Sequence, residues 1–211
     1  MAQRRLPWLG PAVITGSLVP FASLAQRAIA HRLGANPVAT ALNQLGLLAL
    51  VFLTASLSCT PLKIAFGWTW PVRIRRTLGL LAFFTALCHF LVYFCLDQAF
   101  SLAAFLADVK KRPFISLGFT ALLLLVPLAL TSTKRSITRL GFRAWQRLHQ
   151  LAYLIGVLAV VHFYLRVKAD HTEPLLYAAV LGFGFGLRIV AAWQAAQNTR
   201  RRALARAGRP G

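Results

Sequence analysis

The sequence predicts an all-α membrane protein, a six-helix transmembrane bundle whose two termini both lie in the cytoplasm. Three observations lead to this prediction: the composition, six apolar runs of membrane-spanning length, and an uneven distribution of basic residues. Of the 211 residues, 58% are hydrophobic and only 13% are charged, and the mean hydropathy is +0.63. A soluble domain has about 25% charged residues, so most of this chain is expected to face lipid.

The apolar runs define the predicted spans. A helix needs about 20 apolar residues to cross roughly 30 Å of hydrocarbon. The six candidate runs are Trp8–Ala30, Ala41–Leu57, Leu78–Leu96, Ile115–Leu130, Leu148–Val167 and Leu175–Trp193. Together they predict a single transmembrane domain over residues 1–211, whose last part, 194–211, is a basic cytoplasmic tail. Thr60-Pro61 is expected to break the chain after the second run. In the sixth run, Gly182 and Gly186 are predicted to let a neighbouring helix approach closely.

The basic residues predict the orientation and exclude one class of partner. With alternating spans, 17 of the 24 Lys and Arg, including Arg4 and Arg5, lie on the side of the termini. The other side has 7, together with all four acidic residues. Because loops rich in Lys and Arg stay in the cytoplasm, both termini are predicted to be cytoplasmic. The basic residues fall in short clusters between apolar runs, which is typical of anchors to membrane lipids and not of a nucleic-acid-binding surface.

Two histidines are predicted to lie at one depth inside the bundle. In this topology the third and fifth helices run in the same direction. His89 lies 13 residues after Arg76, and His162 lies 13 residues after His149, which is roughly 20 Å along each helix. A single intramembrane histidine more often hydrogen-bonds a neighbouring helix, but a matched pair with no acid nearby favours a metal or haem. Non-haem sites typically need three or four protein ligands, whereas haem needs two. His89 and His162 are therefore the predicted axial ligands of a haem iron.

The other two candidate groups lie nearer the cytoplasmic side. In an ideal helix His149 is about 140° around the axis from His162, so the two histidines need not bind the same group. Arg75 and Arg76 stand at the start of the third helix, at about the depth of His149 in the predicted bundle. The arginine pair has the chemistry of a bidentate phosphate clamp. The alternative is ordinary anchoring by positive residues at the cytoplasmic surface.

Several segments resemble the MsrQ family, also called YedZ. They are RIRRTLGL (73–80), ALCHFLVYFCLDQ (86–98), LALTSTKRSITRLGFRAWQRLHQLAYL (128–154) and VHFYLRVKAD (161–170). The resemblance implies a bundle of ferric-reductase-like type in the bacterial inner membrane, acting as a subunit of a system that repairs oxidised methionines in periplasmic proteins. It further implies that electrons come from the quinone pool, that haem b and FMN carry them, and that a periplasmic molybdenum-containing partner, MsrP, reduces the sulfoxide.

The resemblance also suggests how the cofactors are distributed. Two-haem members of the group have four histidine ligands, and this chain has equivalents of three: His89, His149 and His162. Arg75 and Arg76 stand where the fourth would be, which implies one haem b between His89 and His162 and FMN near Arg75, Arg76 and His149. Two other functions remain open. A self-contained two-haem ferric or oxygen reductase is disfavoured by the missing histidine, and a proton-coupled transporter by the absence of intramembrane acids.

Overall fold

The computed structural model describes residues 6–207, so Arg4, Arg5 and the end of the tail at 208–211 lie outside the described residues. Within the described part the chain forms helices and no strands. Six of its helical segments are long and apolar enough to cross a membrane. The predicted fold class, an all-α six-helix bundle, is therefore confirmed. The cytoplasmic placement of the termini stays a prediction.

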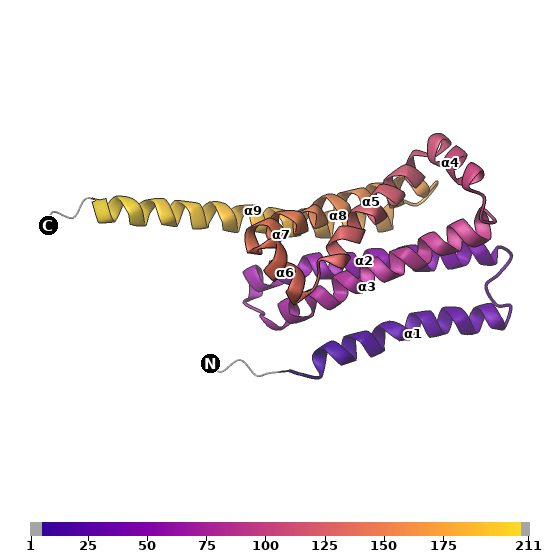
Figure 1. The fold of residues 1–211 in the computed structure, drawn as a ribbon, viewed down its shortest axis with the longest axis horizontal. Helices are drawn as coiled ribbons and strands as arrows, with labels where there is room; N and C mark the ends of the chain where they lie inside the picture. The colour runs from indigo at the N-terminus through magenta and orange to yellow at the C-terminus, as the bar shows by residue number, and fades with distance from the viewer. Residues whose placement is uncertain (1–5, 208–211) are drawn as a thin grey trace.

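The elements in chain order are α1 (Leu9–Ile29), α2 (Pro37–Phe66), α3 (Trp70–Val92), the π-helical turn η1 (Tyr93–Asp97), α4 (Leu102–Lys111), α5 (Pro113–Leu130), α6 (Lys134–Leu140), α7 (Phe142–His149), α8 (Leu151–Arg166) and α9 (Thr172–Ala207). The six spans are α1, α2, α3 with η1, α5, α7 with α8, and α9. The described chain begins and finishes at the same end of the bundle, beyond which α9 extends well past the other helices (Figure 1).

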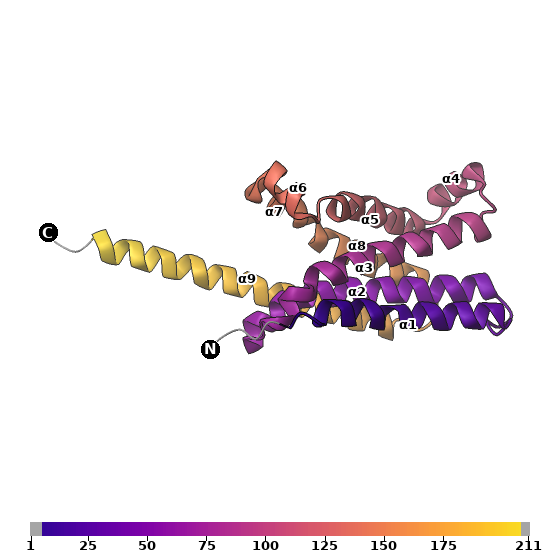
Figure 2. The same cartoon turned by 60° about the horizontal axis from the view of Figure 1, so that its bottom comes forward.

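The short helices mark the two ends of the bundle. Both views place α6 and α7 toward the end where the termini lie and α4 at the opposite end (Figures 1 and 2). In the predicted orientation α4 is therefore on the outer side. The N-cap residue of α4 is Ser101, whose Oγ accepts a hydrogen bond from the Ala104 N–H at 3.2 Å, as serine often does in this position. Within α4 the side chain of Phe105 is buried, whereas those of Leu102 and Leu106 are exposed.

Helix α2 is the centre of the packing. It contacts α3 most extensively and also packs against α8 and α9, while α5 packs mainly on α8 and α1 lies outside against α3. The buried core that joins these helices consists of aliphatic side chains, among them Leu53, Leu57, Leu78, Leu125 and Ile155. Because the central helices are held on several sides, polar groups that they carry can be fixed at defined positions inside the bundle.

The predicted break at Thr60-Pro61 is wrong, because α2 continues through Pro61 to Phe66. Proline has no N–H, so the carbonyl four residues earlier, that of Leu57, loses its helical partner. Arg188 of α9 replaces that partner, since its Nη2 donates to the Leu57 carbonyl at 2.8 Å. Neighbouring helices satisfy proline-freed carbonyls in this way inside membranes. The helix ends instead at Gly67, which adopts a positive φ of 71°, as glycine does at helix ends.

The close approach of α9 to α2 takes place at a different glycine from those predicted. A Cβ at Gly182 or at Gly186 would have no neighbouring atom within 4 Å. At Gly184 it would lie 3.1 Å from Cγ of Pro61. The glycine between the predicted pair is therefore the one that faces α2, because α9 is rotated so that Gly182 and Gly186 lie away from it.

The fifth span is not one continuous helix. Helix α7 ends at His149 and α8 begins at Leu151. The Gln150 N–H is shared between the carbonyls of Gln146 at 3.1 Å and Arg147 at 3.2 Å, which is the tightened geometry of a helix end. The direction of the His149 side chain relative to His162 therefore depends on this break and not on the rotation of an ideal helix.

Candidate functional site

A cavity of about 330 Å³ lies between α2, α3, α5 and α8. This volume falls within the range of about 300–1,000 Å³ found for ligand and cofactor sites. Its walls are mostly apolar, and aliphatic and aromatic side chains from all four helices form them, including Leu50, Ala82, Phe90, Phe119, Leu125 and Ile155. The cavity is thus shaped for a mostly apolar group inside the bundle.

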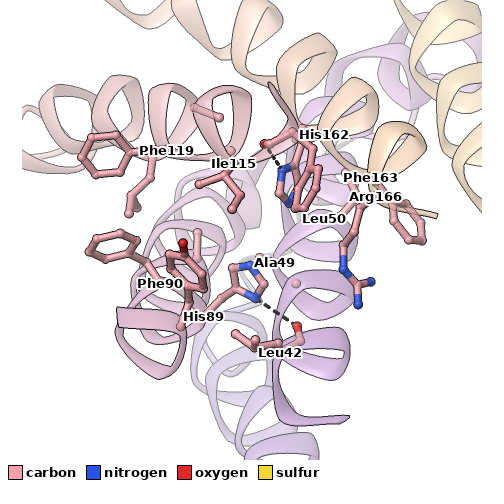
Figure 3. Close-up of a pocket in the computed structure, with 18 of the residues that line it drawn as sticks. Leu42, Ala49, Leu50, His89, Phe90, Ile115, Phe119, His162, Phe163 and Arg166 are labelled. Carbon is pink, nitrogen blue, oxygen red and sulfur yellow. Dashed lines mark hydrogen bonds between the residues drawn. The ribbon is translucent and has the colours of Figure 1, made fainter. Parts of the chain in front are cut away.

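Two imidazoles face each other across this cavity (Figure 3). His89 comes from α3 and His162 from α8, and their ring centroids are 6.4 Å apart with the planes at 85°. An imidazole nitrogen binds a transition metal at about 2.0–2.1 Å and lies about 1.1 Å from its own ring centroid, so two imidazoles on opposite sides of one ion have centroids about 6.2–6.4 Å apart. The structure brings the two histidines to the separation that a shared ion requires.

Backbone carbonyls orient both rings. Nδ1 of His89 donates to the Leu42 carbonyl of α2 at 2.9 Å, and Nδ1 of His162 donates to the Phe114 carbonyl of α5 at 2.6 Å. A carbonyl oxygen only accepts, so the proton of each neutral ring is on Nδ1 and Nε2 keeps its lone pair. The second nitrogen of each ring points into the space between them (Figure 3). Such a bond on the remote nitrogen is typical of metal-binding histidines.

Two glycines make room for the rings, and the sequence analysis did not identify them. A Cβ at Gly118 would lie 2.7 Å from Nδ1 of His162, and a Cβ at Gly46 would lie 3.1 Å from Cε1 of His89. In each helix the glycine follows the accepting carbonyl by four residues, since Gly46 follows Leu42 and Gly118 follows Phe114. Residues four apart share a helix face. Both neighbouring helices therefore present a carbonyl and, one turn later, a space for the imidazole.

The donor set suits a cofactor that brings further ligands of its own. Over residues 6–207 there is no group of three or more His, Cys, Asp and Glu side chains placed to hold a metal ion. His89 and His162 thus offer two nitrogen ligands inside an apolar cavity. Haem supplies four nitrogens and takes axial ligands from the protein. The residues present fit a bis-histidine haem.

The structure brings together two of the three residues predicted for the second cofactor. Arg75 interacts electrostatically with both His149 and Arg188, and its Nη1 donates to the Thr60 hydroxyl at 3.3 Å. Arg75 and Arg76 are both exposed, and in the described part of the chain Arg76 makes no hydrogen bond with Thr60, Arg75 or His149. Of the predicted pair, Arg75 is therefore the one that interacts with Thr60, His149 and Arg188.

His149 is held by residues of the same inner region. Its Nε2 lies 3.1 Å from the Thr131 hydroxyl, and its ring lies 4.2 Å from that of Trp145 at an angle of 30°. The Trp145 indole N–H in turn donates to the Thr131 carbonyl at 3.0 Å. Thr131 and Trp145 thus fix His149 at the end of α7, and His149 does not line the cavity that His162 lines.

Comparisons with known proteins identify the family. The family described as "Ferric reductase like transmembrane component" matches residues 40–160. Proteins named "Protein-methionine-sulfoxide reductase heme-binding subunit MsrQ" are similar over most of their length. The one from Deinococcus radiodurans is 52% identical over 86% of this chain and 90% of its own. The one from Rhodospirillum rubrum is 46% identical over 86% of this chain and 87% of its own.

A third relative with the same name, from Ralstonia nicotianae, is 41% identical over 86% of this chain and 85% of its own. No solved structure gives a significant match. The family match and the three relatives agree with the segments that resemble MsrQ in the sequence. The chain therefore belongs to the ferric-reductase-like transmembrane group and, within it, to the MsrQ family.

Proposed function

We propose that this protein is the haem-binding membrane subunit of a methionine sulfoxide reductase system in the bacterial inner membrane. It takes electrons from quinol of the respiratory chain and delivers them to a periplasmic molybdenum-containing reductase, MsrP, with which it forms a heterodimer. Haem b and FMN are its cofactors. The observation that carries the proposal is the pair of imidazoles at 6.4 Å across an apolar cavity. The names of its relatives, each a haem-binding subunit of a protein-methionine-sulfoxide reductase, support it.

His89 and His162 would hold the haem iron. Bound haem supplies a one-electron iron couple. The bonds from Nδ1 of both rings to backbone carbonyls keep Nε2 unprotonated and aimed at the metal position. The walls around the two rings are mostly apolar. The chain's own part is to fix two ligands in this mostly apolar environment, and the sulfoxide chemistry belongs to the partner.

The proposed FMN site lies near Arg75, Arg76 and His149, at the end of the bundle where the termini lie. Arg75 and Arg188 are close enough to interact, although both are cations. All four carboxylates of the chain belong to the opposite side in the predicted topology. A region with clustered guanidinium groups and no carboxylate favours an anionic group such as a flavin phosphate.

The visible spectrum of the purified protein tests the proposal. We expect the absorption of low-spin bis-histidine haem, and about one haem and one FMN per chain in pyridine haemochrome and flavin assays. A colourless protein from cells with adequate haem would contradict the redox function and favour the transporter. Two haems and no flavin would favour the self-contained ferric or oxygen reductase.

The arginine pair allows a sharper test of the flavin site. We expect Arg75→Ala to lower FMN content more strongly than Arg76→Ala, because Arg75 hydrogen-bonds Thr60 and interacts electrostatically with His149, whereas Arg76 does neither in the described part of the chain. Loss of one charge-assisted phosphate contact should weaken binding by about tenfold or more. Flavin fluorescence after denaturation measures the content, and haem absorbance serves as the internal control. Full flavin retention in the double variant would return both arginines to simple membrane anchoring.

A further inference from the structure

The polar side chains of the cavity are not spread evenly. Apart from the two histidines, the polar groups that line it are Asn43, Tyr93, Asp97, Arg112 and Arg166. All of them lie near the end of the bundle where α4 is found, whereas Leu53, Ala82, Leu125 and Ile155 line the other end. The cavity therefore has one apolar end and one polar end with two guanidinium groups and one carboxylate, that of Asp97. A flat cofactor with a polar edge can enter such a space in one orientation only.

Arg166 is placed on the same side of α8 as His162. It follows His162 by four residues, so the two side chains share a helix face. Its Nη2 donates to the side-chain carbonyl of Asn43 on α2, the residue next to Leu42, whose carbonyl orients His89. Figure 3 shows the guanidinium beside the space between the two imidazoles. Asn43 thus holds the guanidinium at the edge of the cavity.

The two arginines differ in their charge partners. Arg112 pairs with Asp108, whose Oδ1 lies 3.4 Å from Nε of Arg112. Asp108 also accepts hydrogen bonds from Tyr93 at 3.0 Å and Gln98 at 3.2 Å. Arg166 is partly buried, and its guanidinium hydrogen-bonds the neutral side-chain amide of Asn43. A partly desolvated cation without a carboxylate is costly, so an anionic group of a bound molecule would relieve the cost.

We propose that Arg166 binds a carboxylate of the porphyrin that occupies this cavity, and that it thereby fixes which edge of the porphyrin faces the α4 end. The inference rests on the proposed haem site. Guanidinium groups bind carboxylates through two parallel hydrogen bonds, and the two carboxylates of haem lie on one edge of an otherwise apolar ring. Arg112 already has its carboxylate in Asp108, so its contribution is smaller.

The test combines protein variants with a changed cofactor. The full-length protein in detergent is prepared without haem and titrated with haem b and with haem dimethyl ester, in which both carboxylates are blocked. For haem b, Arg166→Gln should raise the apparent Kd by about tenfold to a hundredfold. Arg112→Gln is the matched control and should change it less than about fivefold, because an exposed ion pair contributes little. With the dimethyl ester, wild type and Arg166→Gln should bind alike.

The reduction potential gives an independent readout. Removing a positive charge at the edge of the haem site disfavours the reduced form, so the midpoint potential of Arg166→Gln should fall, and Arg166→Lys should retain most of the wild-type value. Equal haem b affinity in wild type and Arg166→Gln would refute the role of Arg166. So would an equal loss for the dimethyl ester, because the arginine would then support the fold and not the carboxylate. Full haem binding in His162→Ala would instead refute the haem site itself.

Discussion

Replacing His89 or His162 with alanine is expected to abolish the low-spin haem spectrum and to lower bound haem by more than tenfold. Each substitution removes one of the two imidazoles that face the cavity, whose ring centroids are 6.4 Å apart. Loss even of an outer hydrogen-bond partner of a metal ligand typically costs about 10–100-fold in affinity, and loss of the ligand should cost more. The Soret absorbance per mole of protein and the electron paramagnetic resonance spectrum measure the result.

A histidine outside the bundle provides the matched control. His31 lies in the loop between α1 and α2, is exposed and has a positive φ of 53°. Asparagine tolerates this backbone conformation, so His31→Asn removes an imidazole without strain. We expect its haem content to equal that of the wild type. An unaltered low-spin spectrum in both His89→Ala and His162→Ala would show that neither histidine is an axial ligand.

Adding a single methyl group at Gly118 is expected to have the next largest effect. The Cβ of Gly118→Ala would lie 2.7 Å from Nδ1 and 2.8 Å from Cε1 of His162, so the ring has to move. That movement breaks its hydrogen bond to the Phe114 carbonyl and turns Nε2 away from the cavity. We expect about a tenfold loss of haem affinity, together with a destabilisation of about 1–3 kcal/mol from overpacking. Haem titration and thermal unfolding measure the two effects.

Other glycines calibrate this prediction. A Cβ at Gly46 would meet Cε1 of His89 at 3.1 Å, so Gly46→Ala should act in the same direction but less strongly. At Gly182 a Cβ would have no neighbour within 4 Å, and alanine there should leave haem binding unchanged while favouring the helix by up to about 1 kcal/mol. If Gly118→Ala bound haem as tightly as Gly182→Ala, the close fit around His162 would not matter for the site.

Hydropathy and charge were sufficient to predict the spans, because a membrane imposes a length and a polarity on every segment that crosses it. The break at Thr60-Pro61 was wrong for a reason that no local pattern contains. The carbonyl freed by Pro61 is satisfied by Arg188, which is 131 residues away from Leu57 in the chain. The same distant contact holds the Arg188 guanidinium against α2 inside the bundle.

The candidate site was only partly predictable from spacing. His89 lies 13 residues after Arg76 and His162 lies 13 residues after His149, and this equal spacing predicted one depth for both because the rise of a helix is fixed. Spacing of four residues connects Leu42 with Gly46, Phe114 with Gly118, and His162 with Arg166. Such spacing is common on any helix. It therefore identifies a site only when the helix that packs against these residues is known.

The sequence by itself determined the class of protein, the six spans and the two histidines at one level, because these follow from the apolar length and rise of single helices. Only the tertiary structure decided which carbonyl orients each imidazole, which glycine makes room for it and which arginine lies at the edge of the cavity. Those contacts depend on the rotation and separation of helices that pack against one another. Packing among α2, α3, α5 and α8 sets both, and residues far apart in the chain contribute to it.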